Sequence, residues 1–337
     1  MSEKRTRDWP KVRLHVVTGK GGTGKSTVAA ALALALATRG KNVLLCEVEG
    51  RQGIARMFDV DPLPPEERRL TTGLPAEDGT PGVVHALHID PESALLEYLS
   101  LYYKLGRAGR ALDRFGVIEF ATTIAPGVRD VLLTGKLFEA VERNSRNKGA
   151  IQYDAVVLDA PPTGRIVQFL NVSNELAGLA KVGPIKSQSD TMMTLFRSPR
   201  TAVHLVTVLE EMPVQETADG IAELRSVDLP VGGVVVNLIR PQDMAADDLA
   251  DARSGSIDRE RVTADLTRAG VRHDPALVDG LLVEARDHAE RRALEDSQRE
   301  LVADLGVPTY ELPRLPQGVD LGALYELAAS LREQGMA

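Results

Sequence analysis

The sequence has only one cysteine, Cys46, among its 337 residues. A single thiol excludes an internal disulfide and any metal site that needs several cysteines from one chain. The chain also lacks an excess of positive charge, because its formal net charge is −8 at pH 7. This charge balance argues against a nucleic-acid-binding surface as the main function, and we expect no nucleic-acid partner.

Long hydrophobic runs are missing as well. The longest, residues 28–37, is far shorter than the roughly 18 residues that span a membrane. The N-terminal stretch MSEKRTRDWPK contains no apolar signal core. We therefore predict a cytoplasmic protein, in which any membrane role goes through a partner. Hydrophobic residues at 43% and charged residues at 26% are ordinary for a soluble globular protein.

A glycine-rich loop near the N-terminus is the strongest chemical motif of the sequence. Gly19–Ser26 reads GKGGTGKS and matches the phosphate-loop pattern G-x-x-x-x-G-K-[ST]. The apolar stretch 12–18 before it predicts a buried strand, and the Ala/Leu-rich stretch after it predicts a helix that ends at Gly40. The backbone N–H groups of such a loop face a polyphosphate. Lys25 would reach the β- and γ-phosphates, and the Ser26 hydroxyl would bind Mg²⁺.

A second lysine, Lys20, directly follows the first glycine of the loop. The loop does not need this lysine for its fold, and two like charges at one site repel each other unless an anion is present. We therefore expect Lys20 to have a phosphate partner. The alternative is a solvent-exposed lysine that binds nothing.

Acidic residues mark the ends of two predicted strands. Strand 41–48 leads to Glu47 and Glu49, which lie on the same side of the strand at the edge where α/β proteins bind ligands. Glu49 is a candidate to orient the attacking water, and Glu47 could support Mg²⁺ or its water shell; the alternative is a solvated strand end. Strand 153–158 ends at Asp159, which can hold Mg²⁺ through water.

Two further positions suit a nucleotide. In the loop D-A-P-P-T-G-R that begins at Asp159, Gly164 would let a backbone N–H approach the γ-phosphate. The two prolines make this loop stiff, so a change at one end can reach the other. Asn237 follows the apolar strand 231–236 and can offer a donor and an acceptor to an adenine edge. The alternative for Asn237 is a simple turn residue.

The rest of the chain is predicted to add helices to one nucleotide-binding domain of residues 1–337. Residues 60–82, rich in Pro, Gly and charge, predict a mobile loop. The predicted helical additions are the insertions at 91–149 and 171–200 and a charged excursion at 241–305.

Four segments together resemble the ArsA family of ATPases: KGGTGKST at 20–27, DAPPTGRIVQFL at 159–170, VTVLEEMPVQET at 206–217 and VVVN at 234–237. That family includes the arsenite-pump ATPase subunit and the ATPase that delivers tail-anchored membrane proteins, and the sequence looks most similar to its actinobacterial anion-transporter subgroup. The resemblance implies an α/β fold with a mostly parallel β-sheet flanked by helices, and an ATP-dependent closure of a dimer. The loop resembles a deviant Walker A motif, whose extra lysine, here Lys20, reaches across the dimer interface to the partner's nucleotide.

The motifs and the resemblance together assign roles to individual positions. Thr27 matches the α-phosphate contact, and Asn237 matches the adenine contact. The nucleotide-binding residues would be Gly21, Gly22, Thr23, Gly24, Lys25, Ser26, Thr27, Gly164, Asn237, Pro313, Leu315 and Pro316. The catalytic residues would be Glu49, Lys20 and Lys25, and the residues that hold Mg²⁺ would be Ser26, Asp159 and Glu47.

The sequence departs from the family pattern in four ways. Glu49 replaces an aspartate and is one methylene longer, so hydrolysis is slower or the water sits differently. Arg165 stands where the family has histidine. No C-x-x-C motif is present, so we expect no zinc between subunits. The helical segment after Asp159 is short for a groove that holds membrane helices.

These observations predict a Mg²⁺-dependent ATPase that acts as a nucleotide-driven dimeric switch and handles membrane-protein or transport partners. The dimer would join two copies of this chain, or this chain and a paralogous ATPase. The alternatives are an ATPase subunit of an anion transport system and a positioning ATPase of the MinD/ParA type. Stimulation by arsenite is not expected, because a three-coordinate thiolate site needs more cysteines than Cys46.

Overall fold

The computed structural model describes residues 8–38, 40–48, 52–75, 80–91, 93–94, 126–143, 149–171, 184–316 and 318–337. Within these ranges the strands form an eight-stranded sheet in the order β3-β4-β2-β5-β1-β6-β7-β8. The strands are β1 Leu14–Gly19, β2 Asn42–Glu47, β3 Arg68–Thr72, β4 Val83–His88, β5 Ala155–Asp159, β6 Thr201–Thr207, β7 Val231–Ile239 and β8 Thr309–Pro313.

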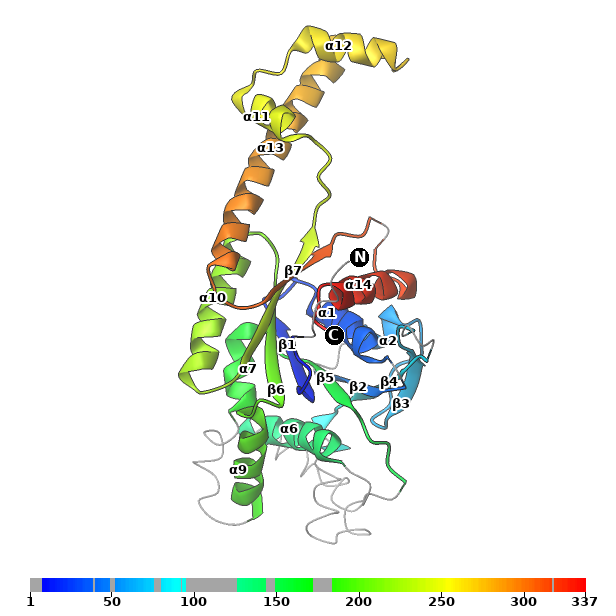
Figure 1. Ribbon diagram of the computed structural model, residues 1–337, viewed down its shortest axis with the longest axis vertical. Helices are drawn as coiled ribbons and strands as arrows, with labels where there is room; N and C mark the ends of the chain where they lie inside the picture. The colour runs from blue at the N-terminus through cyan, green and yellow to red at the C-terminus, as the bar shows by residue number, and fades with distance from the viewer. Residues whose placement is uncertain are drawn as a thin grey trace.

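Neighbouring strands run parallel, except that β3 is antiparallel to β4. The central strands are buried along their whole length, as in β1, β5 and β6, which is the pattern of a parallel sheet covered on both faces. The predicted α/β fold with a mostly parallel sheet is therefore confirmed (Figure 1).

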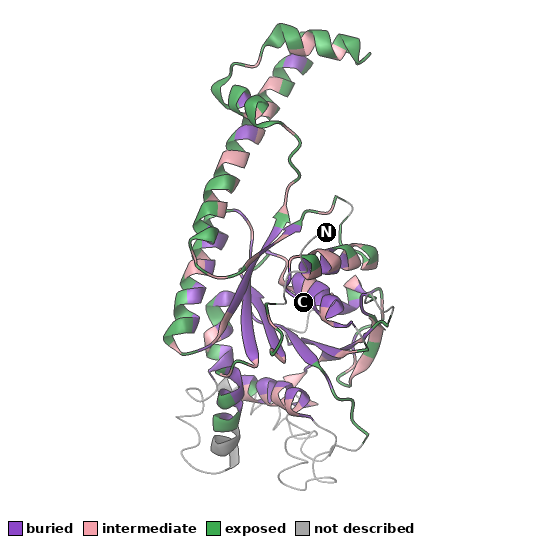
Figure 2. Cartoon of the chain, in the orientation of Figure 1, coloured by how far each residue is buried: buried purple, intermediate pink, exposed green. Residues whose placement is uncertain are grey.

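Helices cover both faces of this sheet. One face packs against α1 Lys25–Leu36, α2 Gly53–Met57 and α14 Leu321–Glu333, and the other against α6 Pro126–Glu142, α7 Thr163–Leu170, α9 Pro184–Phe196 and α10 Glu211–Ser226. Figure 2 shows the sheet as the buried centre of the molecule. Because the loops at the carboxyl ends of parallel strands gather at one edge, this layering places the ligand-binding edge beside the first turn of α1.

The stretch 60–82, predicted as a loop, contains β3, so that prediction was wrong for these five residues. Among the described strands, β3 lies at the sheet edge, pairs only with β4 and has a register shift between Arg69 and Thr71. Its sequence, RRLTT, carries little apolar alternation because an edge strand buries little of its surface. Most of the predicted insertion at 91–149, including residues 95–125, lies outside the described residues. The predicted division of the chain stays a prediction.

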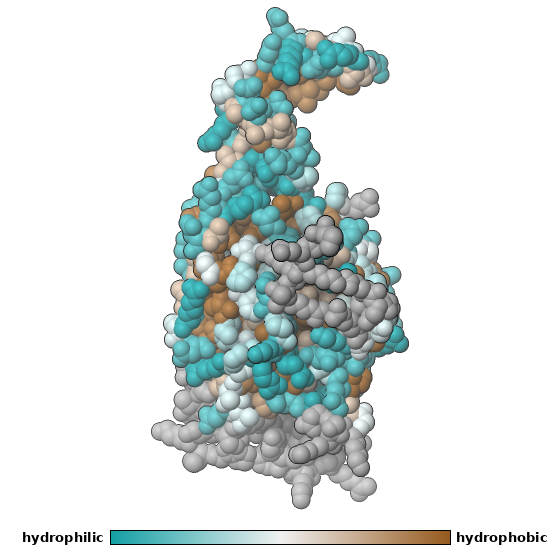
Figure 3. Space-filling view, in the orientation of Figure 1, coloured by the Kyte–Doolittle hydropathy of each residue, from teal (hydrophilic) through white to brown (hydrophobic). Residues whose placement is uncertain are grey.

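A helical arm projects from the body. It consists of α11 Ala246–Ser254, α12 Arg259–Arg268 and α13 Pro275–Ala303, and Figure 1 shows α11 and α12 at its far end. Helix α13 has 29 residues, so it is about 43 Å long. Asp274, directly before it, caps its N-terminus, because its side chain accepts a hydrogen bond from the backbone N–H of Leu277. The arm surface is largely hydrophilic (Figure 3).

Within the described ranges, no helix combines the length and the hydrophobicity that crossing a lipid bilayer requires.

Two buried histidines lie side by side across β1 and β6. His15 Nδ1 and His204 Nε2 are 3.0 Å apart, and the backbone N–H of Gly233 donates to His204 Nδ1 at 3.1 Å. His204 therefore carries its proton on Nε2 and donates it to His15. This leaves the His15 proton on Nε2, an atom that has no hydrogen-bond partner in the described ranges. Burial, with a smaller contribution from Lys41, lowers the pKa of His15 to about 3.

We expect this pair to make the protein acid-sensitive. The ordinary pKa of 6.5 applies to His15 in the unfolded chain and about 3 in the folded one, so below pH 6.5 the unfolded state binds a proton that the folded state refuses. The contribution of His15 to the free energy of unfolding should therefore fall by about 1.4 kcal/mol per pH unit as the pH drops through this window. His15→Gln keeps an acceptor for His204 but does not titrate.

Urea unfolding at several pH values between about 6 and 4 checks this. The wild type should lose stability relative to His15→Gln by about 1.4 kcal/mol per pH unit. His288→Gln on the arm should behave like the wild type. A constant difference between wild type and His15→Gln across this range would contradict the neutral pair.

Candidate nucleotide site

The phosphate loop joins β1 to α1, and its glycines are required by close neighbours. A Cβ at Gly19 would lie 2.2 Å from the carbonyl oxygen of Val206 on β6. Gly24 has φ of 87°, and a Cβ there would lie 2.3 Å from Nδ2 of Asn237. A Cβ at Gly21 or Gly22 would meet nothing within 4 Å, so the loop is open where a phosphate group would enter.

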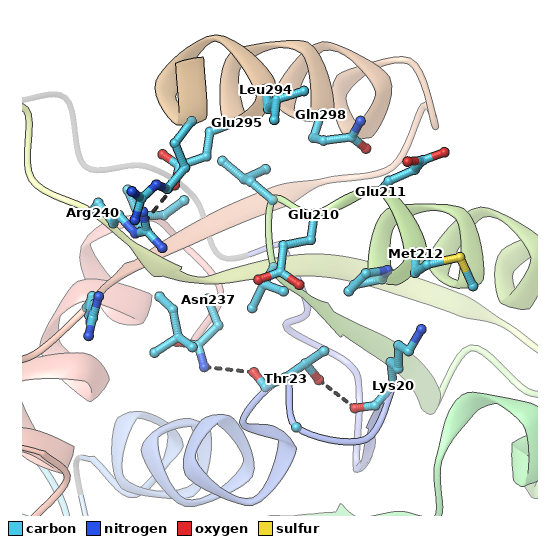
Figure 4. Close-up of a pocket in the computed structure, with 18 of the residues that line it drawn as sticks. Lys20, Thr23, Glu210, Glu211, Met212, Asn237, Arg240, Leu294, Glu295 and Gln298 are labelled. Atoms are coloured by element: carbon cyan, nitrogen blue, oxygen red, sulfur yellow. Dashed lines mark hydrogen bonds and ion pairs between the residues drawn. The ribbon is translucent and has the colours of Figure 1, made fainter. Parts of the chain in front are cut away.

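Asn237 fastens this loop to β7. Its Nδ2 donates to the carbonyl oxygen of Thr23 at 2.9 Å, and the Thr23 hydroxyl donates to the carbonyl oxygen of Lys20 at 2.9 Å (Figure 4). Asn237 is buried and lies within β7, which continues to Ile239. The side chain thus holds the loop in shape, and its predicted contact with adenine stays a prediction.

Ser26 and Asp159 meet at the carboxyl edge of the sheet. The Ser26 hydroxyl donates to Asp159 Oδ2 at 2.5 Å. Asp159 is the last residue of β5, next to Val17 of β1, and is buried. Hydroxyl and carboxylate oxygens are the ligands that Mg²⁺ prefers, so this pair fits the predicted magnesium site.

Glu47 adds a third oxygen group to the same edge. It is the last residue of β2 and pairs in register with Asp159. Its Oε1 accepts a hydrogen bond from the backbone N–H of Gly53 at 2.8 Å, at the start of α2. Its Oε2 is buried and has no hydrogen-bond partner among the described residues. A buried carboxylate oxygen without a partner is costly, and Mg²⁺ or one of its waters would satisfy it.

The two lysines of the loop lie differently. Lys25 Nζ is 3.5 Å from the carbonyl oxygen of Lys20, so it stays on its own loop. Lys20 Nζ instead lies 3.7 Å from Glu216 Oε2 on α10, and both side chains are 32% exposed. The ammonium group of Lys20 is therefore paired with α10 and is partly open to solvent.

A cavity of about 650 Å³ opens beside the first half of the loop. Figure 4 shows α13 with Leu294, Glu295 and Gln298 on one side and Thr23 and Asn237 on the other. The wall of this cavity consists of residues from the phosphate loop, the start of α10, the end of β7 and α13. The cavity therefore connects the phosphate loop with the base of the arm.

The remaining predicted residues lie around this edge or outside the described residues. The Thr27 hydroxyl donates to Met57 Sδ at 3.7 Å, and Gly164 is an exposed residue in the first turn of α7. Pro313 ends β8 opposite Ile239. Leu315 packs at the periphery of the core, and Pro316 is exposed. Glu49 lies outside the described residues.

The sequence analysis missed two residues that connect the site to its surroundings. The Thr18 hydroxyl donates to the carbonyl oxygen of Pro161 at 2.7 Å and so links β1 to the loop after β5. Glu216 holds Lys20. Thr18 lies directly before the phosphate loop, and Glu216 lies in the segment VTVLEEMPVQET. The sequence could not reveal their contacts, because the partner of each residue is far away in the chain.

Cys46 lies inside the sheet on β2 and is fully buried. Burial raises the pKa of its thiol, and the charge of Glu67 adds to this effect. A thiol of this kind stays protonated and is a poor metal ligand. Among the described residues, no group of three or more His, Cys, Asp and Glu side chains is placed to hold a metal ion.

The fold and the site together define the class of protein to which the chain belongs. A phosphate loop between β1 and α1, with a strand-end aspartate on the loop serine, is the arrangement of P-loop nucleoside triphosphatases. The chain belongs to the ArsA_ATPase family, described as anion-transporting ATPases, whose pattern matches residues 12–199. The predicted family is confirmed, and with it the prediction that the chain is an ATP hydrolase.

Two relatives extend the comparison over most of the chain. ATPase BagA of Mycobacterium tuberculosis is 54% identical over 332 residues, which are 97% of this chain and 96% of that protein. ATPase GET3 of Kluyveromyces lactis is 24% identical over 255 residues, which are 66% of this chain and 70% of that protein.

Proposed function

We propose that the chain is a Mg²⁺-dependent ATPase that works as a nucleotide-driven dimeric switch for membrane-protein or transport partners. The observation that carries the proposal is the hydrogen bond from Ser26 to Asp159, with the unpartnered oxygen of Glu47 beside it. Lys25 would bind the β- and γ-phosphates, and Ser26, Asp159 and Glu47 would hold Mg²⁺, which offsets phosphate charge. Glu49, two residues after the end of β2, would orient the attacking water.

Two contacts support a switch at this site. Glu47 joins the magnesium position to the start of α2, and Thr18 joins β1 to the loop at Pro161. A bound nucleotide that pulls on Glu47 or Asp159 would therefore move the segments that follow β2 and β5. Order and position changes in such segments are a common way for nucleotide state to reach a partner.

The partly exposed position of Lys20 supports a dimer. Its ammonium group lies on Glu216 rather than on its own loop, so it is available to the nucleotide of a facing subunit. We propose that the second subunit is another copy of this chain or a paralogous ATPase. No zinc is proposed at the interface.

The purified protein allows a direct test. We expect ATP hydrolysis that requires Mg²⁺, and a dimer by light scattering with Mg²⁺ and ATP that dissociates with ADP. ATP hydrolysis by a species that stays monomeric in every nucleotide state would leave the ATPase but remove the dimeric switch.

The name of the family gives a second candidate, the ATPase subunit of an anion transport system. We predict that arsenite and antimonite do not stimulate ATP hydrolysis, because the one thiol of the chain is buried in β2 and its pKa is raised. Turnover is measured with increasing arsenite in the wild type and in Cys46→Ser. A saturable stimulation that survives in Cys46→Ser would contradict this prediction.

A further inference from the structure

Two arginines from different helices converge on a small polar cavity beside the loop that follows β5. Arg129 lies on α6 and Arg165 on α7, and these helices pack against each other. The cavity has a volume of about 220 Å³, and Val48, at the end of β2, and Pro161 also line it. It therefore lies at the carboxyl edge of the sheet, close to Glu47 and Asp159 in the chain.

Within the part of the chain that the structure describes, neither guanidinium group has a side-chain partner. Among the described residues, no side chain makes an ion pair or hydrogen bond with that of Arg129 or Arg165, and both residues are exposed. Some other arginines of the body are paired, for example Arg143 with Glu67 at 2.7 Å and Arg200 with Glu142 at 2.7 Å. Two unpaired arginines at one cavity make a positive site in a chain whose net charge is −8.

The cavity suits a small oxyanion. A water molecule takes up about 30 Å³ in the liquid, so the volume of about 220 Å³ holds a tetrahedral anion and a few waters. Arg129 and Arg165 would bind it by charge-assisted hydrogen bonds, which their planar groups form with phosphate oxygens. Asp130 also lines the cavity and is buried, so the arginines leave one net positive charge.

We propose that Arg129 and Arg165 form a binding site for inorganic phosphate, separate from the phosphate loop, that holds the product of ATP hydrolysis before it leaves. This inference rests on the proposed function, because hydrolysis supplies the phosphate. No bond forms or breaks at the site. Arginine suits this task because it stays charged and binds phosphate oxygens in a bidentate manner.

The first experiment measures binding of inorganic phosphate to the nucleotide-free protein by phosphorus NMR in a buffer without phosphate or sulfate. We expect saturable binding in the wild type and a loss of about 10-fold or more in affinity in Arg129→Ala and in Arg165→Gln, since each removes hydrogen bonds to a charged group. Arg272→Ala, an exposed arginine of the arm, should bind like the wild type. Thermal unfolding shows that each variant is folded.

Lys25→Ala separates this site from the phosphate loop. The proposal requires phosphate binding to persist in Lys25→Ala. Binding that is lost in Lys25→Ala and unchanged in both arginine variants would overturn it, because phosphate would then sit on the loop. No binding to the wild type would overturn it as well.

A second experiment follows phosphate produced from ATP in one turnover. Cleavage is followed by chemical quench, and release by a fluorescent phosphate sensor. We expect release to lag behind cleavage in the wild type and the lag to shorten severalfold in Arg165→Gln, while an unchanged lag would contradict the proposal. A wild type that cleaves no ATP would remove the proposed function, whereas the binding experiment would still decide whether the two arginines hold phosphate.

Discussion

Lys25→Ala is expected to lower the affinity for Mg²⁺-ATP by about 100-fold or more and to reduce turnover to background. Lys25 is the first residue of α1, and its Nζ lies on the carbonyl oxygen of Lys20 within the loop. A hydrogen bond to a charged group contributes about 1.5–3 kcal/mol, and Lys25 would make such bonds to two phosphates. Titration calorimetry measures the affinity, and phosphate release measures the turnover.

The fold should not suffer from this change. Lys25 is only partly buried and has no ion pair among the residues that the structure describes, so its thermal unfolding should stay close to that of the wild type. Lys11→Ala, an exposed lysine before β1, is the matched control and should bind ATP normally. Equal ATP affinity in Lys25→Ala and Lys11→Ala would exclude the loop as the nucleotide site.

Lys20→Ala is expected to lower turnover by about 10³-fold or more and to change Mg²⁺-ATP affinity by only about threefold. A cation supplied by a second subunit stabilises charge that develops in the transition state, and the comparable arginine finger contributes about 10³–10⁵ in rate. In this structure Lys20 lies 3.7 Å from Glu216 and not on its own phosphate site. Its loss should therefore affect chemistry far more than binding.

Glu216→Gln distinguishes this role from a structural one. If the pair of Lys20 and Glu216 only stabilised the loop, both variants would lose activity together. We expect Glu216→Gln to keep or raise turnover, because it frees Lys20 for the facing subunit. A large loss of ATP affinity in Lys20→Ala would instead show that Lys20 serves its own nucleotide.

The sheet and the phosphate loop could be predicted from the sequence because their determinants are local. The loop needs glycines where a Cβ would strike Val206 or Asn237, and the buried strands are continuous apolar runs. Strand β3 was missed because an edge strand needs no such run. The charged stretch 241–305 was predicted as helical, but not as an arm with a 29-residue helix. Whether a helix packs on the body or projects from it depends on contacts with distant residues.

Contacts between distant residues could not be predicted. Lys20 and Glu216, and His15 and His204, come together only because β1 and β6 are neighbours in the sheet. Glu47 was predicted near Mg²⁺ from its strand end, but its hydrogen bond to the start of α2 depends on how the chain turns after β2. The site residues that stay predictions, Glu49 above all, are those whose role needs a bound nucleotide.

The most direct test of the dimeric switch mixes two inactive variants, Lys20→Ala and Lys25→Ala, and measures ATP turnover. In a mixed dimer, the subunit with Lys20→Ala keeps its own Lys25 and receives Lys20 from its partner, so one site is complete. The account predicts that activity returns on mixing, up to about half of the wild-type rate per mixed dimer. No recovery in a sample shown to contain mixed dimers would contradict action of Lys20 across the interface.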